Sequence, residues 1–394
     1  MIRIAFFIYG GGSSLGNINY LTNLITALVA HSECEVEPVV FRAEEISSKT
    51  DLAALASTGA ETIATPVLNA ARSRQHLIRA IVFGRVSEIE DLLVANHCDC
   101  LFENAVFTGW RSQIPRLAWI PDFQHKALPH MFKRLALLKR ELGFRAQLFS
   151  GRTLIVSSEA AKRDFERYYA FASQKPYVVR FPSLLASSAI TDPAGAARRY
   201  EIAEPYFYIP NQFWKHKNHG IVINALEILE RQGLKPLLVL SGRQQDPRHP
   251  KWFAQLKASI EKSSVNKQIK MLGLIPYKDV INLNAGALAI INPSRFEGWS
   301  TSVEEAKALG TPLILSNLPV HIEQTQNAGN YFDPDDANAL AHHMMRALNE
   351  PMLYSRVPKL MLLELNADRT RDFALNFAAA VTSCVTPQNK SLAS

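Results

Sequence analysis

The chain has 394 residues, of which 47% are hydrophobic and 20% are charged. This length predicts two or three domains, because one domain usually takes about 150 residues. The apolar content is sufficient for folded cores and excludes an extended disordered chain. No apolar run approaches the roughly 18 residues that a membrane span requires. We therefore expect residues 1–12 to form a buried first strand rather than a signal peptide or an anchor.

The positive charge is concentrated in one part of the chain. The formal net charge is +7, and the window from Arg116 to Arg152 contains eight basic and two acidic residues. Such a concentration favours an anionic partner or surface. Four cysteines are too few for a disulfide scaffold, and Cys98 and Cys100 lack the two-residue gap of common zinc pairs. These features predict a reducing, cytoplasmic location.

Short apolar runs alternate with longer helical patterns, and the series runs twice along the chain. Continuous apolar runs are typical of parallel strands that are covered on both faces. The predicted strands lie at residues 2–9, 37–41, 152–158, 206–210, 236–242, 269–273, 287–294 and 311–317. The fold class is therefore α/β, with two doubly wound domains that face a ligand cleft at the carboxyl ends of their strands.

Composition also predicts where these domains begin and end. Residues 1–185 form the N-terminal domain, and residues 186–205, rich in Pro, Ser, Ala and Gly, form a linker. Residues 206–365 form the C-terminal domain. The tail, residues 366–394, has helical spacing, and its return to the first domain is left open.

A glycine-rich turn follows the first predicted strand. Gly11 and Gly12 allow backbone N–H groups to approach a phosphate or a sugar, although a simple tight turn is an equal alternative. Leu15 stands where a dinucleotide fingerprint has its third glycine, and Arg42 rather than an acidic residue follows the second strand. These departures argue against a nicotinamide-dependent oxidoreductase.

Two glutamates flank the start of a predicted helix that runs from about Thr301 to Gly310. Glu297 lies in the preceding loop, and Glu305 lies in the first turns of the helix. A carboxylate can accept two hydrogen bonds from a cis-diol, while the helix dipole favours a diphosphate. Either Thr301 with Glu304 or Ser302 with Glu305 fits a capping box, and we assign Glu304 to capping and Glu305 to a ligand.

Residues 293–317 resemble the signature region of the retaining nucleotide-sugar glycosyltransferases of the GT-B fold, often called family 4 or group 1. The resemblance rests on Pro293-Ser294, on Glu297-Gly298-Trp299 and on Glu305-Ala306 before a G-x-P strand. It covers most of residues 200–345 and, more loosely, the N-terminal half. It implies an acceptor-side domain at 1–185 and a nucleotide-sugar domain at 206–365.

The resemblance also implies roles for individual residues. Glu305 binds the ribose hydroxyls and Glu297 the donor sugar. Main-chain groups near the donor belong to Gly298, Trp299, Ser300, Thr301, Leu274 and Ile275. The diphosphate clamp of the family, an Arg followed five residues later by a Lys, corresponds here to Gln212 and Lys217. Because Gln carries no charge, we expect Lys215 to compensate, although a solvated helix start is the alternative.

A histidine of the N-terminal domain lies near the donor sugar in this family. His125 is the first candidate, with Asp122 to orient it, and His130 is the second; a satisfied structural histidine is the alternative. The basic window continues as an amphipathic helix over residues 132–149. One face, with Leu135, Leu138, Leu142 and Phe149, is expected to pack on the domain. The other face is expected to be solvated or to contact an anionic membrane, and contains Lys133, Leu137, Arg140, Phe144 and Leu148.

The leading hypothesis is a retaining, cytoplasmic glycosyltransferase that is peripheral to the membrane. It transfers a sugar from a UDP- or GDP-sugar to a saccharide or lipid-linked saccharide in polysaccharide synthesis. We expect no cofactor and no metal, since Asp333 and Asp335 fit a turn better than a metal motif. The alternatives are a silent nucleotide-sugar-binding partner protein and, less favoured, the oxidoreductase. We expect no nucleic-acid partner, because no recognition motif accompanies the basic window.

Overall fold

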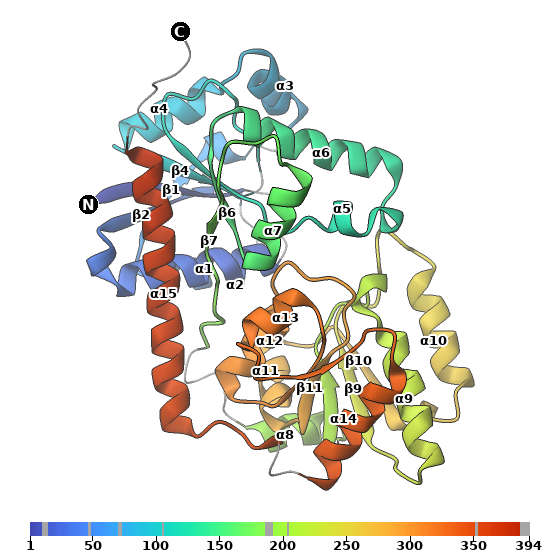
Figure 1. Ribbon diagram of the computed structural model, residues 1–394. Coiled ribbons are helices and arrows are strands. Elements are labelled where there is room, and N and C mark those ends of the chain that lie inside the picture. The colour runs from blue at the N-terminus through green and yellow to red at the C-terminus, as the bar shows by residue number, and fades with distance from the viewer. Residues whose placement is uncertain are drawn as a thin grey trace. The chain divides into compact units, whose positions relative to one another are not determined.

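The computed structural model describes residues 1–9, 15–45, 49–69, 73–104, 106–185, 192–202, 205–350 and 354–386. The chain divides into two compact units. The first contains Met1–Phe123, Arg134–Phe181 and the residues from Asp368 on, and the second contains Gln124–Lys133 and Pro182–Ala367. Each unit is built on a parallel sheet with helices packed on it (Figure 1). The prediction of two doubly wound α/β domains is thereby confirmed.

The sheet of the first unit has the strand order β3-β2-β1-β4-β5-β6-β7, and all of its pairings are parallel. Its strands are β1 (Ile2–Ile8), β2 (Val36–Ala43), β3 (Glu61–Thr65), β4 (Cys100–Glu103), β5 (Arg116–Trp119), β6 (Thr153–Val156) and β7 (Tyr177–Val178). Its helices are α1 (Leu15–Ala30), α2 (Lys49–Ala56), α3 (Arg74–Val82), α4 (Ser87–Ala95), α6 (Arg134–Phe149) and α7 (Glu159–Tyr168). The order reverses beside β1, as in doubly wound sheets.

The sheet of the second unit has the order β10-β9-β8-β11-β12-β13 and is also parallel. Its strands are β8 (Tyr206–Ile209), β9 (Leu237–Ser241), β10 (Ile269–Gly273), β11 (Ala289–Asn292), β12 (Leu313–Ser316) and β13 (Asn330–Phe332). Its helices are α5 (Gln124–Ala127), α8 (Pro193–Arg199), α9 (His219–Arg231), α10 (Trp252–Lys262), α11 (Tyr277–Gly286), α12 (Thr301–Leu309), α13 (Pro319–Gln324) and α14 (Ala337–Asn349). The topological switch lies between β8 and β11.

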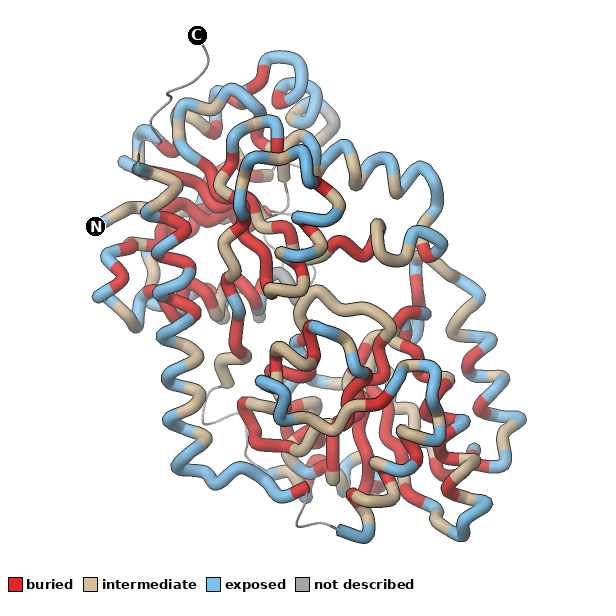
Figure 2. Tube along the Cα trace, viewed as in Figure 1, coloured by how far each residue is buried: buried red, intermediate tan, exposed pale blue. Residues whose placement is uncertain are grey.

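The apolar runs are buried on both faces of their sheets. In β8, Phe207 and Ile209 belong to one core cluster, whereas Tyr206 and Tyr208 belong to another. This alternation explains why the strand is apolar throughout, since neither face meets solvent. Figure 2 shows the strands of both sheets as buried and the outer helix faces as exposed. Each of the eight predicted strands coincides with an observed one.

Two segments differ from the predicted domain division. Residues 193–199, expected within a linker, form α8: Asp192 accepts a hydrogen bond from Gly195 N at 2.7 Å, and Ala196 is buried in the second unit. Residues 124–133, expected within the N-terminal domain, group with the second unit. A low-complexity composition does not exclude a helix when an N-cap and a proline at the first turn are present.

The last helix, α15 (Lys359–Val385), contributes its second half to the first unit. The ring of Phe377 lies 6.0 Å from that of Phe6 and 5.5 Å from that of Phe102. These contacts add apolar surface to the core beside β1 and β4. No helix among the residues that the structure describes has the length and apolar content needed to cross a membrane.

Helix α6 packs through the face opposite to the predicted one. Leu148 is buried and Phe144 packs on the core cluster around Phe123, while Arg140 pairs with Asp122 at 2.6 Å. The face predicted to pack is instead exposed: Leu135 by 77%, Leu138 by 56%, Leu142 by 58% and Phe149 by 74%. The prediction was wrong because both faces of this helix are apolar, and only the surrounding aromatic core selects one of them.

Candidate functional site

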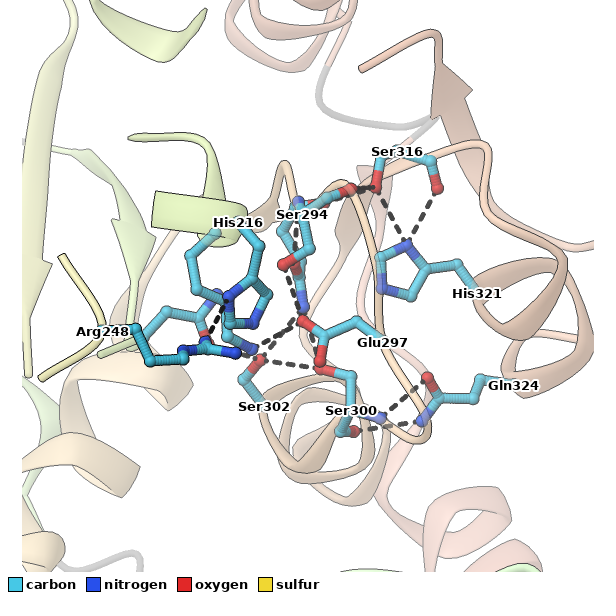
Figure 3. Close-up of polar contacts among 12 residues, drawn as sticks. His216, Arg248, Ser294, Glu297, Ser300, Ser302, Ser316, His321 and Gln324 are labelled. Atoms are coloured by element: carbon cyan, nitrogen blue, oxygen red, sulfur yellow. Dashed lines mark hydrogen bonds and ion pairs between the residues drawn. The ribbon is translucent and has the colours of Figure 1, made fainter. Parts of the chain in front are cut away.

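The candidate site is built from loops that follow β8 and β11 in the second unit. Lys217, in a short 3₁₀ turn after β8, donates from Nζ to Glu297 Oε1 at 2.6 Å. Ser294, two residues after β11, donates from its hydroxyl to the same oxygen at 2.6 Å. No hydrogen bond from the described part of the chain reaches Glu297 Oε2. One carboxylate oxygen is therefore anchored, and the other is available to a ligand (Figure 3).

Glu297 is half-buried and ionised. Burial raises the pKa of its carboxyl group, but the charge and hydrogen bond of Lys217, together with the neighbouring His216 and His321, bring the pKa below its ordinary value. An ionised carboxylate only accepts hydrogen bonds, which suits it to the hydroxyl groups of a sugar.

Buried polar side chains hold the start of α12 against the ends of the central strands. Asn292, the last residue of β11, donates from Nδ2 to Ser300 Oγ at 2.8 Å, and its Oδ1 lies 2.7 Å from Ser294 Oγ. Ser302 donates to Asn211 Oδ1, just after β8, at 3.2 Å. These bonds fix the loop that carries Glu297 relative to both strands.

The N-terminus of α12 has no side-chain cap. Ser300 occupies the N-cap position, but its hydroxyl does not bind the first turn. The capping box predicted for Thr301 and Glu304 is therefore wrong. Glu304 is buried and accepts hydrogen bonds from Lys307 at 2.8 Å and from Gln324 at 2.9 Å. An uncapped helix N-terminus presents N–H groups and a positive dipole to an anion.

Glu305 lies further along the same helix in a different environment. Its half-buried carboxyl group accepts a hydrogen bond from the hydroxyl of Tyr277, the first residue of α11, at 3.0 Å. Burial raises the pKa of Glu305 to about 7. In the loop before α11, Leu274 is 62% exposed, whereas Ile275 packs against a core cluster. The hydrogen bond from Tyr277 thus connects Glu305 to the start of α11, directly after the predicted base-contacting loop.

The predicted diphosphate clamp is divided by the structure. Gln212 accepts a hydrogen bond at Oε1 from Arg243 N at 3.1 Å, so its amide ties the loop after β8 to the loop after β9. Lys215 has an exposed side chain, and its main-chain N–H donates to Asp246 at 3.0 Å. Lys217 is the cation that contacts Glu297.

With this geometry in place, the chain can be compared with known proteins. A model of the family described as glycosyl transferases group 1 matches residues 199–359. Residues 199–359 belong to the group 1 glycosyl transferases. This group 1 domain contains the whole arrangement of Glu297, Glu305 and Lys217.

Relatives and solved structures extend the comparison. O-antigen chain mannosyltransferase B of Escherichia coli is 24% identical over 53% of this chain and 55% of its own length, so the chain spans about half of that relative. A glycosyltransferase from Rickettsia africae has a TM-score of 0.65 at 16% identity, covering 97% of both chains. Anabaena HepE in complex with UDP-glucose has a TM-score of 0.65 at 13% identity, covering 97% of this chain and 100% of its own. The solved structures establish the GT-B fold.

Other predicted residues lie around the group 1 domain in different ways. His125 is buried in α5, within the segment that groups with the second unit, and His130 is exposed. Asp122, expected to orient His125, forms an ion pair with Arg140 at 2.6 Å. Gly298 and Trp299 are half-buried in the loop after Glu297, and Gly11 and Gly12 lie outside the described residues.

Sequence reasoning missed several polar residues of the group 1 domain. His321, fully buried, lies with Nδ1 2.9 Å from Ser316 O, and its ring lies between Ser316 and Glu297 (Figure 3). Burial lowers the pKa of His321, so the ring is neutral. Tyr277 was also missed. A lone tyrosine or histidine carries no spacing signal, because its role depends on contacts with residues distant in sequence.

Proposed function

We propose that the chain is a retaining glycosyltransferase that uses a nucleoside diphosphate sugar. One observation carries this proposal: Glu297 is half-buried and ionised, is anchored by Lys217 and Ser294, and lies beside the uncapped N-terminus of α12. The helix N-terminus can bind an anion, and the carboxylate beside it can accept hydrogen bonds from hydroxyl groups. Together they suit a sugar linked to a diphosphate.

In the proposed reaction the N-terminus of α12 and Lys217 stabilise the departing diphosphate. The bond between the anomeric carbon and the diphosphate oxygen breaks, and its electron pair stays on that oxygen. The acceptor hydroxyl forms the new bond on the same face of the sugar and passes its proton to the departing oxygen. Glu297 Oε2 accepts hydrogen bonds from the sugar, and Glu305 accepts them from the ribose. No metal takes part in this scheme.

The names of similar proteins narrow the proposed substrates. The first relative is named as an O-antigen mannosyltransferase, and one structural neighbour was solved with UDP-glucose. We therefore favour a UDP- or GDP-hexose as donor and a saccharide or lipid-linked saccharide as acceptor, in cytoplasmic synthesis of cell-surface polysaccharide.

A membrane contact is also part of the proposal. It uses the exposed face of α6, which is opposite to the face that the sequence pattern suggested for this contact. Leu135, Leu138, Leu142 and Phe149 are exposed beside the exposed cations Arg134 and Lys139. Apolar groups next to cations favour the surface of an anionic bilayer.

Sedimentation with vesicles tests this contact. Leu138→Glu should weaken binding to anionic vesicles about tenfold or more. The carboxylate removes an apolar contact with the bilayer and is repelled by its anionic lipids. Leu360→Glu, at a 79% exposed leucine of α15, is the matched control. Equal sedimentation of wild type and Leu138→Glu would contradict the contact.

The donor is tested by thermal denaturation with UDP, GDP, their sugars and nicotinamide cofactors. A ligand at 100 times its dissociation constant stabilises the folded state by about 2.7 kcal/mol. Stabilisation by NAD or NADP alone would favour the oxidoreductase. Donor binding without transfer to any acceptor would favour the silent partner protein. The anomeric proton coupling of the first product distinguishes retention from inversion.

A further inference from the structure

One guanidinium group connects the two segments that carry His125 and Lys217. Arg248 lies between β9 and α10 and donates from Nη1 to Gln124 Oε1 at 2.8 Å. Its Nη2 lies 3.1 Å from His216 Nδ1 (Figure 3). Gln124 directly precedes His125, and His216 directly precedes Lys217. Both pairs of neighbours belong to the second unit.

Arg248 also contacts an aromatic ring in each of these two segments. The Arg248 guanidinium carbon lies 4.9 Å from the ring centre of Phe132 and 5.2 Å from that of Trp214. Phe132 belongs to the segment 124–133, and Trp214 precedes the turn that carries Lys217. A planar cation that stacks on aromatic rings and donates from two nitrogens uses properties that lysine lacks.

The turn on which Lys217 lies is itself fixed by this cluster. Burial, aided by the charge of Lys217, lowers the pKa of His216 to about 3. His216 is therefore neutral, and its Nδ1 accepts the proton of Arg248. The main-chain oxygen of His216 accepts a hydrogen bond from Arg295 N at 2.8 Å. Arg295 lies two residues before Glu297, so the cluster extends to the loop of that carboxylate.

The loop that carries Arg248 is held in place as well. Asp246, whose side chain is fully buried, accepts hydrogen bonds from Arg248 N at 2.9 Å and from Lys215 N at 3.0 Å. The loop and the turn therefore share one carboxylate, which leaves Arg248 little freedom to reorient.

We propose that Arg248 is a positioning residue that holds the segment 124–133 against the turn of Lys217. It acts through Gln124 and His216 and touches no substrate. Its effect on turnover rests on the proposed function, in which Lys217 stabilises the departing diphosphate, and on the predicted place of His125 near the donor sugar. A shift of about 1 Å between two such groups lowers turnover by up to about 100-fold.

The decisive variant is Arg248→Lys, which keeps the charge and loses the two-nitrogen fork and the stacking plane. Hydrogen exchange of the amides in 124–133 should rise about tenfold or more, while exchange in α14 stays unchanged. Turnover should fall about tenfold or more, with the donor dissociation constant within about twofold of wild type. Arg346→Ala is the control, because Arg346 lies on α14 and pairs with Glu350. It should change neither the exchange in 124–133 nor the turnover.

Gln124→Leu gives an independent measurement, because it removes the acceptor and keeps the cation. Its effect on exchange should not add to that of Arg248→Lys, since both changes remove the contact between Arg248 and Gln124. Unchanged exchange in 124–133 in both variants, or additive effects, would overturn the proposal. If the wild type binds no nucleotide sugar, the proposed function fails, but the exchange measurement still decides the role of Arg248.

Discussion

Glu297 and Glu305 are the same residue type, close in sequence, yet the pKa values of their carboxyl groups are shifted in opposite directions. Both are removed from water, which raises the pKa of each carboxyl group. At Glu297 this effect is more than offset by Lys217, with smaller contributions from His216 and His321. At Glu305 the hydroxyl of Tyr277 lowers the pKa only in part, and the pKa is about 7. The comparison teaches that a cation from a distant strand end, rather than local sequence, decides which of the two carboxyl groups has a lowered pKa.

Removing the cation should have the largest effect. Lys217→Ala is expected to lower turnover by about 100-fold or more, equivalent to about 2.7 kcal/mol, because the diphosphate and Glu297 lose the same positive charge. Steady-state kinetics at saturating donor measure this loss. Lys215→Ala is the matched control: its exposed side chain predicts a loss below about tenfold. Equal losses in both variants would contradict the assignment of Lys217.

Glu304, which lies between Glu297 and Glu305 in the sequence, tests whether a carboxylate of α12 serves stability or ligand binding. Glu304→Gln should lower the free energy of unfolding by about 1–3 kcal/mol, because Lys307 loses its buried partner. Urea denaturation measures this change, and nucleotide affinity should stay within about twofold. Glu305→Gln should do the reverse, with weaker nucleotide binding and no loss of stability. A large loss of affinity in Glu304→Gln would show that α12 orients the ligand differently.

The raised pKa of Glu305 predicts a pH-dependent affinity for nucleotide. Only the deprotonated carboxylate accepts both ribose hydroxyls, so affinity should increase about tenfold between pH 6 and pH 8. Calorimetric titration across this range measures it. Tyr277→Phe should move the midpoint upward, since the hydroxyl of Tyr277 stabilises the charged form. A flat profile in wild type and in Glu305→Gln alike would exclude Glu305 from the ribose site.

The smallest expected effect is that of a chelator. If Lys217 supplies the charge beside Glu297, EDTA should leave the initial transfer rate unchanged. Asp335 is already paired with Arg295, and Asp333 Oδ1 accepts a hydrogen bond from Asp335 N at 2.8 Å, which fits the predicted turn. Loss of activity in EDTA, with recovery on adding magnesium, would show that a metal ion supplies the positive charge that we assign to Lys217.

Local pattern was a good guide where local forces decide. The strands β8 to β12 were predictable because apolar runs must be buried on both faces. Helix α12 was predicted from about Thr301 to Gly310, and Gly310 indeed ends it with a φ of 65°. The exposed face of α6 was not predictable in this way, since its two apolar faces are equivalent until Phe123 and Tyr169 pack on one of them.

The amino-acid sequence by itself determined the two parallel sheets, the helix after Glu297 and the membership of residues 199–359 in a known family. The tertiary structure decided which polar side chains pair: Lys217 and Glu297 are 80 residues apart, and Arg248 and Gln124 are 124 residues apart. Periodicity reports burial along one element. The pairing of polar side chains depends instead on which loops and strand ends the fold brings together. No local pattern encodes a contact between residues so far apart in the sequence.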